Sequence, residues 1–290
     1  MLEDILLFYG RKLPLQRGKI RVVDALWPLI IRRKEYIRTA TLCSGNYRIR
    51  CDLRDLIQRQ LYFFGTYFHE RELLHLWIEA ARKSFVIFDV GANVGIYSLA
   101  ASAENRAAQI HAFEPTPEIA DQLKKTLIEN AIGNVHVQQI AVSSAAGEAS
   151  LVRYRGDQDA NGGMNYIRLR GASIEDEGIS TVSIDEYCRA NKIEEIDLLK
   201  LDIQGHEAEA LLGAEFMIAN RKIRTVFLEL NWSSSSIDEC VATNCIDRLD
   251  AAGYQFSKPE IPLKFKNRGA WMRGLGDVIA SRGSVSGQDD

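Results

Sequence analysis

The feature that most constrains this fold is the stretch FVIFDVGANVG, residues 85–95, in which an apolar run leads into a loop with two glycines. Its first four residues are apolar and precede Asp89, a pattern typical of a strand buried on both faces in a parallel sheet. Beyond the loop, Ile96, Leu99 and Ala100 recur at helical spacing. The stretch therefore predicts a strand, a tight turn and a helix, whose free N–H groups favour polar or anionic ligand groups.

The loop differs from the dinucleotide fingerprint G-x-G-x-x-G, because Asn93 stands where the second glycine would be. That glycine lets a pyrophosphate approach the backbone, so its replacement argues against an NAD-linked oxidoreductase, which stays open as an alternative. A non-catalytic cofactor-binding module and a plain strand-to-helix turn in a doubly wound domain also stay open.

The next predicted strand, residues 109–113, ends in Glu114 and Pro115. An acidic residue about 20 positions past the glycine loop, at the carboxyl end of the second strand, can accept hydrogen bonds from both ribose hydroxyls of a nucleoside. The alternative interpretation of Glu114 is a solvated strand end. Pro115 stops the strand, since proline lacks the N–H that a sheet needs.

Three segments, DVGANVGIYS, AFEPTPE and DLLKLDIQGHEAEALLGA, together resemble the FkbM family of S-adenosylmethionine-dependent methyltransferases. The resemblance runs from about Tyr47 to about Leu230 and includes residues 55–70. One departure is Gln204, where the family often has Glu in a D-x-E-G-x-E pattern. The resemblance implies an α/β fold of the class I, Rossmann-like type, with a doubly wound, mostly parallel seven-stranded sheet. It also implies S-adenosyl-L-methionine as cofactor and O-methylation of a hydroxyl on a small molecule, sugar or polyketide.

The expected cofactor-binding residues lie at the carboxyl ends of the predicted strands, which face one crevice in this topology. Asp89 is expected to contact the methionine ammonium, and Glu114 the ribose. A third strand is predicted over residues 135–142, and by resemblance its end lies near the adenine. The complete predicted set is Asp89, Gly91, Ala92, Asn93, Gly95, Glu114, Pro115, Ala141, Val142 and Asp202.

The expected catalytic residues, Asp202, His206 and Glu207, follow the fourth predicted strand, residues 196–201. His206 is the best general base by type, because an unperturbed histidine has a pKa near working pH. Glu207 either serves as that base or caps the following helix. No metal is predicted; Asp202 with Glu229 or Asn231 is the only pair that the sequence offers. Lys200 lies within the apolar strand, so its ammonium needs a partner.

The chain is expected to divide into an N-terminal extension (1–80), a methyltransferase domain (81–281) with an insertion (145–183), and a disordered tail (282–290). In the extension, Pro14 and Pro28 are expected to interrupt helices, residues 47–53 to form a half-buried strand, and residues 55–64 and 69–81 to form helices. The run DQDANGGMN in the insertion is either a lid or a surface excursion. Later expected elements are a strand at 225–230, a helix at 236–251, a strand at 254–256 and an antiparallel strand at 276–280.

Composition limits the partners. The 290 residues carry a net charge of −3 without a basic stripe, which argues against nucleic acid. Five scattered cysteines without a C-x-x-C pair suit reduced thiols in the cytoplasm. No apolar run approaches the ~20 residues of a membrane-spanning helix. The expected partner is a small-molecule acceptor, and the sequence does not indicate an oligomeric state.

Overall fold

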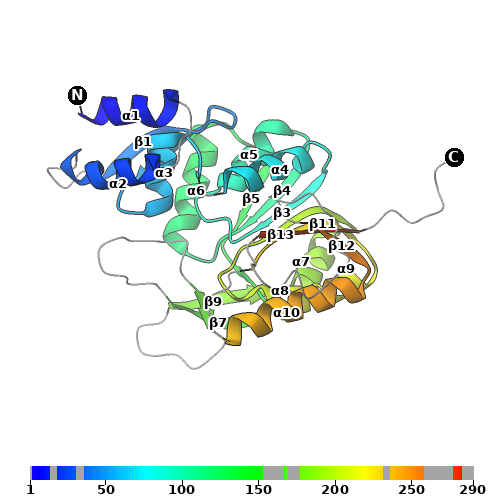
Figure 1. Cartoon of the computed structure of the whole chain (residues 1–290). Coiled ribbons are helices and arrows are strands. Elements are labelled where there is room, and N and C mark those ends of the chain that lie inside the picture. The colour runs from blue at the N-terminus through cyan, green and yellow to red at the C-terminus, as the bar shows by residue number, and fades with distance from the viewer. Residues whose placement is uncertain are drawn as a thin grey trace.

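The centre of the computed structural model is a mostly parallel β-sheet with helices on both faces (Figure 1). The structure describes residues 2–13, 18–30, 36–68, 70–152, 166–168, 177–230, 236–257 and 277–282. Within these residues the sheet has seven strands, in the order β12 (Tyr254–Ser257), β13 (Asp277–Arg282), β11 (Ile223–Glu229), β10 (Ile196–Leu201), β3 (Val86–Val90), β4 (Gln109–Phe113) and β5 (Val135–Gln138). β13 runs antiparallel to both neighbours. The predicted sheet and its antiparallel last strand are confirmed.

The two faces of the sheet are covered by different helices, as the apolar strands require. Ile87 and Leu198 contribute to one hydrophobic cluster, whereas their neighbours Phe88 and Leu199 contribute to the other. Buried residues of α4 (Arg71–Ala81), α5 (Ile96–Glu104) and α6 (Pro117–Glu129) complete the first cluster. The second is completed by α7 (Ile184–Asn191), α8 (Glu207–Leu212), α9 (Glu215–Ala219) and α10 (Ser236–Ala251).

The strand order reverses direction between β3 and β10. From β3 the chain adds β4 and then β5 on one side, and it later returns to add β10 and β11 on the other side. A crevice at the carboxyl ends of strands forms at such a switch point. The carboxyl ends of β3 and β10 are therefore where this fold places a ligand.

The N-terminal extension contains α1 (Leu2–Lys12), α2 (Lys19–Ile30), β1 (Ile37–Thr41), β2 (Arg48–Asp52), α3 (Leu56–Phe64) and most of α4. The predicted strand around 47–53 and the helices at 55–64 and 69–81 are confirmed as β2, α3 and α4. Asp55 caps α3, and Gly65, with φ +75°, ends it. The expectation for Pro28 is wrong, because this proline lies inside α2 near its end. The sequence did not indicate β1, which pairs antiparallel with β2.

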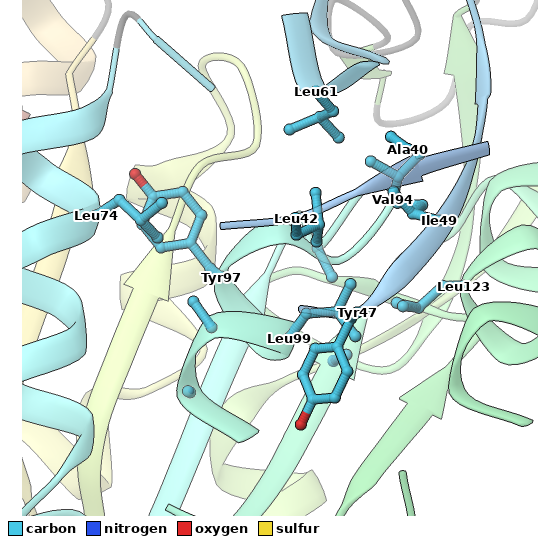
Figure 2. Packing of buried hydrophobic residues seen from close by; sticks show 14 of the residues in the cluster. Ala40, Leu42, Tyr47, Ile49, Leu61, Leu74, Val94, Tyr97, Leu99 and Leu123 are labelled. Carbon is cyan, nitrogen blue, oxygen red and sulfur yellow. The ribbon is translucent and has the colours of Figure 1, made fainter. Parts of the chain in front are cut away.

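The extension shares a hydrophobic cluster with the helices of the central sheet. Figure 2 shows side chains of the extension packed around those of the glycine loop, α5 and α6. They are Ala40, Leu42, Tyr47, Ile49 and Leu61 on one side and Val94, Leu99 and Leu123 on the other. The division between residues 80 and 81 stays a prediction. In this cluster, the side chains of the extension and those of the methyltransferase domain form one continuous core.

The third strand is shorter than predicted. β5 ends at Gln138, and Ala141 and Val142 form β6 in a second sheet. Among the described residues that sheet has the order β6 (Ala141–Val142), β9 (Glu177–Val182), β7 (Gly147–Val152) and β8 (Tyr166–Arg168). The chain bends at Ile140, and both β6 side chains become buried beside β9 instead of β4. The predicted lid run 157–165 lies outside the described residues, and so does the predicted tail 282–290 apart from Arg282, which is the last residue of β13.

Two expectations from composition concern the described residues only. Cys43, Cys51, Cys188 and Cys245 are free thiols, and nothing is described for the side chain of Cys240. Within the described ranges, every helix is too short or too polar to cross a bilayer.

Candidate active site

The glycine loop between β3 and α5 is a run of left-handed backbone turns. Gly91, Asn93 and Gly95 have φ values of +79°, +50° and +90°. A Cβ on Gly91 would lie 1.9 Å from the carbonyl oxygen of Asp202, and a Cβ on Gly95 would lie 2.3 Å from Leu123 in α6. The two glycines therefore allow the β3 loop to contact the β10 loop and α6.

Two hydrogen bonds tie the loop to the end of β4. The N–H groups of Gly91 and Ala92 both donate to the carbonyl oxygen of Phe113, at 3.0 and 2.9 Å. Asn93 occupies the left-handed region, which asparagine tolerates, and its Oδ1 accepts from the N–H of Val94. The backbone N–H of Asn93 thereby points toward the carboxyl end of β4.

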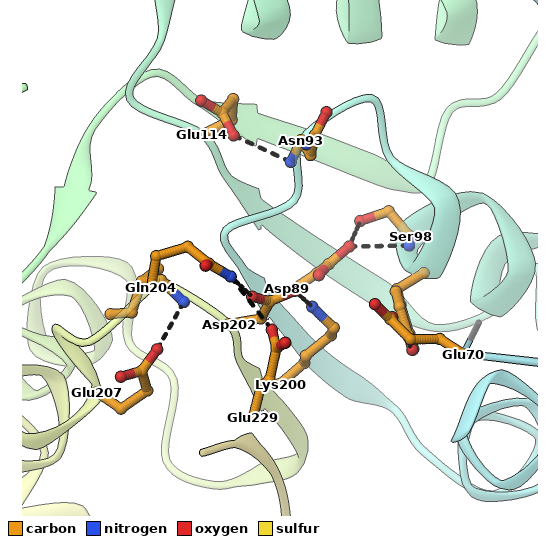
Figure 3. Close-up of polar contacts among 12 residues, drawn as sticks. Glu70, Asp89, Asn93, Ser98, Glu114, Lys200, Asp202, Gln204, Glu207 and Glu229 are labelled. Atoms are coloured by element: carbon orange, nitrogen blue, oxygen red, sulfur yellow. Dashed lines mark hydrogen bonds and ion pairs between the residues drawn. The ribbon is translucent and has the colours of Figure 1, made fainter. Parts of the chain in front are cut away.

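Glu114 lies at that end, held by backbone N–H groups. Its Oε2 accepts from Asn93 N at 3.0 Å and its Oε1 accepts from Thr116 N at 2.8 Å (Figure 3). Burial raises the pKa of Glu114, and these hydrogen bonds oppose the rise. The Thr116 side chain donates as well, and because a carboxylate has about four acceptor sites, capacity for a further donor remains. The alternative of a solvated strand end is wrong, because Glu114 is only 6% exposed. Pro115 is half-buried and lies between Glu114 and Thr116 in the chain.

Asp89 is fully buried at the end of β3 and has one unsatisfied oxygen. Its Oδ2 accepts from the N–H and the hydroxyl of Ser98, at 2.9 and 2.6 Å, whereas its Oδ1 is buried without a partner. Burial raises the pKa of Asp89, and the Lys200 ammonium opposes the rise. Buried acceptors are normally hydrogen-bonded, so Oδ1 marks a place for a donor that the described residues do not supply.

Lys200 is the cation of this region. The register of β10 with β3 sets it opposite Asp89, and its Nζ donates to Asp202 Oδ2 at 2.7 Å. The ammonium also lies 4.5 Å from the ring centre of Tyr97. Burial alone would lower the pKa of Lys200, but Asp202, Asp89 and Glu70 together raise it. Lys200 therefore stays charged in a buried position, and Asp202 is the partner that its ammonium was expected to need.

Asp202 is the acceptor of several neighbours. Burial would raise its pKa, but the Lys200 ammonium, a hydrogen bond with Glu229 and one from Gln204 lower it. Burial and the Asp202 charge raise the pKa of Glu229, so Glu229 is the protonated member of the pair and donates. Asn231 lies outside the described residues. Within the described residues, no three His, Cys, Asp or Glu side chains are grouped so as to hold a metal ion.

Glu207 and His206 are engaged by their own surroundings. Glu207 accepts from the N–H groups of Ile203 and Gly205, both at 2.9 Å, so it holds the loop before α8, whereas α8 itself has no side-chain cap. Burial raises its pKa to about 7. His206 Nε2 lies 3.0 Å from the hydroxyl of Ser143, directly after β6, and burial lowers the pKa of His206. Ala141 and Val142 thus support the histidine side of the crevice through Ser143.

The structure gathers Asp89, the glycine loop, Glu114 and Asp202 around the ends of β3, β4 and β10. It also adds Glu70, which the sequence reasoning missed. The hydroxyl of Tyr97 donates to Glu70 Oε2 at 2.6 Å, and burial raises the pKa of Glu70 to about 7. Lys200 was the one signal in the sequence that a further carboxylate such as Glu70 lies nearby, because a lysine in an apolar strand needs negatively charged partners.

The chain matches the family model described as "Methyltransferase FkbM domain" over residues 89–256. It is 29% identical over 144 residues to the hexuronic acid methyltransferase AglP of Haloferax volcanii, covering 50% of this chain and 56% of AglP. Over 206 residues it is 28% identical to the 31-O-demethyl-FK506 methyltransferase FkbM of Streptomyces tacrolimicus, covering 62% of this chain and 78% of that protein. The 2-O-methyltransferase NoeI of Sinorhizobium fredii is 24% identical over 159 residues, which cover 50% of this chain and 62% of NoeI.

Proposed function

Because this chain belongs to the FkbM family of methyltransferases, we propose that it methylates a hydroxyl of a small molecule, such as a sugar or a polyketide, with S-adenosyl-L-methionine as cofactor. This cofactor supplies a methyl group that is already activated by a positively charged sulfur. The protein then has to hold the acceptor oxygen about 3–3.5 Å from that methyl, in line with the bond that breaks. An NAD-linked oxidoreductase is not favoured.

The observation that carries the proposal is the position of Glu114 against the glycine loop. The carboxylate is fixed by Asn93 N, Thr116 N and the Thr116 side chain, which together leave acceptor capacity for a ribose hydroxyl. Asp89 Oδ1, buried and without a partner, provides an acceptor for an ammonium group. Both features fit a nucleoside that also carries an amino acid.

On the acceptor side, Asp202 supplies fixed negative charge and His206 is the candidate base. The lowered pKa of His206 keeps its imidazole neutral at pH 7, the form that can take a proton. Its Nε2 faces the Ser143 hydroxyl, so His206 can also act by orienting that hydroxyl toward the crevice. Glu207 is assigned to holding the loop through the N–H groups of Ile203 and Gly205.

The acceptor class is inferred from the relatives. One is named as a hexuronic acid methyltransferase, and two carry an oxygen position in their names. The matched segment spans 56% of AglP, so the parts of the relatives that lie outside it give no guide to the acceptor of this chain. A small-molecule acceptor in the cytoplasm, without nucleic acid, is the expectation that we carry forward.

Isothermal titration calorimetry with S-adenosylmethionine and with NAD tests the cofactor assignment. We expect binding of the first and none of the second; the reverse result would identify an oxidoreductase. Turnover to S-adenosylhomocysteine in the presence of candidate sugar and polyketide alcohols then separates an enzyme from a binding module. Cofactor binding without turnover on any alcohol would favour the binding module.

A further inference from the structure

Glu70 reaches the site from outside the residues that match the family model. It lies at the start of α4, yet its carboxylate does not cap that helix. Instead its Oε2 accepts from Tyr97 of α5, and Figure 3 draws the carboxyl beside Lys200 and Asp89. The N-terminal extension therefore contributes an ionisable side chain to the ligand edge of the sheet.

Among the groups that face Glu70, the carboxylates of Asp202 and Asp277 outnumber the ammonium of Lys200, while Glu229 is protonated. Lys200 and Asp202 come from β10 and the loop after it, Glu229 from β11, Asp277 from β13 and Tyr97 from α5, while Tyr67 lies in the same segment as Glu70. The single ammonium in this list, that of Lys200, is already paired with Asp202 at 2.7 Å.

Asp89 gives a second, independent indication that a cation is bound here. It is fully buried opposite Lys200, and its Oδ1 has no partner in the structure. A buried acceptor beside several carboxyls is satisfied by a ligand that brings N–H donors and positive charge. The cofactor of the proposed function has N–H donors on its ammonium, and it carries positive charge on both its ammonium and its sulfonium.

On the basis of the proposed function, we propose that Glu70 is the carboxyl that responds to the charge of the cofactor. It is ionised when cationic S-adenosylmethionine is bound and takes up a proton when the thioether S-adenosylhomocysteine occupies the site. The proton is held at Oε1, because Oε2 accepts from Tyr97. Methylation of a hydroxyl releases one proton, so the same loss of positive charge prepares Glu70 to hold it.

The direction of the pH dependence follows from the environment of Glu70. Burial raises its pKa to about 7; Lys200 and the Tyr97 hydrogen bond oppose the rise, whereas Asp202 and Asp277 add to it. An added cation favours the ionised form and lowers this pKa. Below about pH 7, binding of S-adenosylmethionine must therefore expel a proton. Its affinity rises with pH, by at most about tenfold per pH unit, and levels off above about pH 7.

The test is calorimetric titration of the full chain at about pH 6 and about pH 8.5, in pairs of buffers with different ionisation enthalpies. At the lower pH we expect S-adenosylmethionine to release up to about one proton and S-adenosylhomocysteine less. At the higher pH release from Glu70 should cease, and both ligands should take up protons equally, because their α-amino group has a pKa of about 7.7–8.0 and binds as an ammonium. Glu70→Gln should abolish the difference between the two ligands. Glu72→Gln is the matched control, because Glu72 is a neighbouring glutamate whose side chain is 59% exposed.

A second titrating group must be separated from Glu70. Burial also raises the pKa of Glu207 to about 7, so Glu207→Gln is titrated in parallel. Proton release that persists in Glu70→Gln and disappears in Glu207→Gln overturns the inference. Tyr97→Phe removes the hydrogen bond to Oε2 and should move the rise in affinity to higher pH, which gives a test that does not depend on Glu70→Gln folding.

The two proposals fail in different ways. No binding of S-adenosylmethionine by the wild-type chain would refute the proposed function. Binding whose affinity is independent of pH, in the wild-type chain as in Glu70→Gln, would refute only the role of Glu70.

Discussion

The contact between the glycine loop and the β10 loop makes Gly91→Ala a sharp test of the fold at the switch point. Alanine at φ +79° incurs a left-handed backbone cost of about 1–2 kcal/mol. Its Cβ would also lie 1.9 Å from the Asp202 carbonyl oxygen, and relieving such overpacking typically costs about 1–3 kcal/mol more. The expected loss of about 2–5 kcal/mol is a large part of a domain stability of about 5–15 kcal/mol.

Gly205→Ala is the matched control for this prediction. Gly205 has φ +96°, but nothing lies within 4 Å of a Cβ placed there, so only the backbone cost applies. Urea unfolding followed by circular dichroism should show Gly91→Ala less stable than Gly205→Ala by about 1–3 kcal/mol. Equal free energies of unfolding for the two variants would refute the reasoning, because they would show that the β10 loop moves away without cost.

Three further predictions concern the site. Glu114→Gln should weaken S-adenosylmethionine binding about tenfold to a hundredfold in calorimetry, since hydrogen bonds to a charged group are worth about 1.5–3 kcal/mol; unchanged affinity would remove Glu114 from the site. Asp202→Asn leaves the Lys200 ammonium, 5% exposed, without its ion pair, so urea unfolding should show a loss of about 3–5 kcal/mol that Lys200→Met partly restores. A fully stable single variant would contradict that ion pair. If His206 takes the proton, turnover should rise with pH through a value below its usual pKa of 6.5, and His206→Ala should lower the rate about 10²–10⁴-fold and lose this rise. Retention of the rise in the variant would assign it to another group.

The sequence was sufficient for the central sheet because its strands are self-evident. β3 and β10 are mostly apolar, every position but Val86 is buried, Asp89 is the second-last residue of β3, and Asp202 directly follows β10. The capping box of α7 was equally local: the Ser183 hydroxyl accepts from Glu186 N, as the S-x-x-E spacing predicts. Features set by residues a few positions apart were therefore predictable.

Ala141 and Val142 show where local patterns stop. Residues 135–142 read as one strand, because no glycine or proline marks the bend at Ile140. The two residues pair with Thr181 and Val182 of β9, about 40 positions further along the chain. An apolar pattern predicts that a side chain is buried but does not tell which sheet buries it.

Glu70 was missed for a related reason. In the sequence it is one of two glutamates flanking the start of a helix, and nothing local distinguishes it from Glu72. Its environment is built by Tyr97, Lys200 and Asp202, which only the tertiary fold brings near. The sequence left two roles open for Glu207, general base or helix cap, and it did not indicate the contacts of its carboxylate with the Ile203 and Gly205 amides.

The pairing of Asp89 with Lys200 also bears on synthesis of the chain. Residues 91–195 separate β3 from β10, so at roughly 5–20 residues per second β3 emerges about 5–20 s before the strand that covers its second edge. An apolar strand with an open edge is a template for another nascent chain. A second copy of β3 in the same parallel register would set two Asp89 carboxylates side by side, without the cation that β10 provides. The charge that later serves the ligand edge thus disfavours self-association of the unfinished sheet.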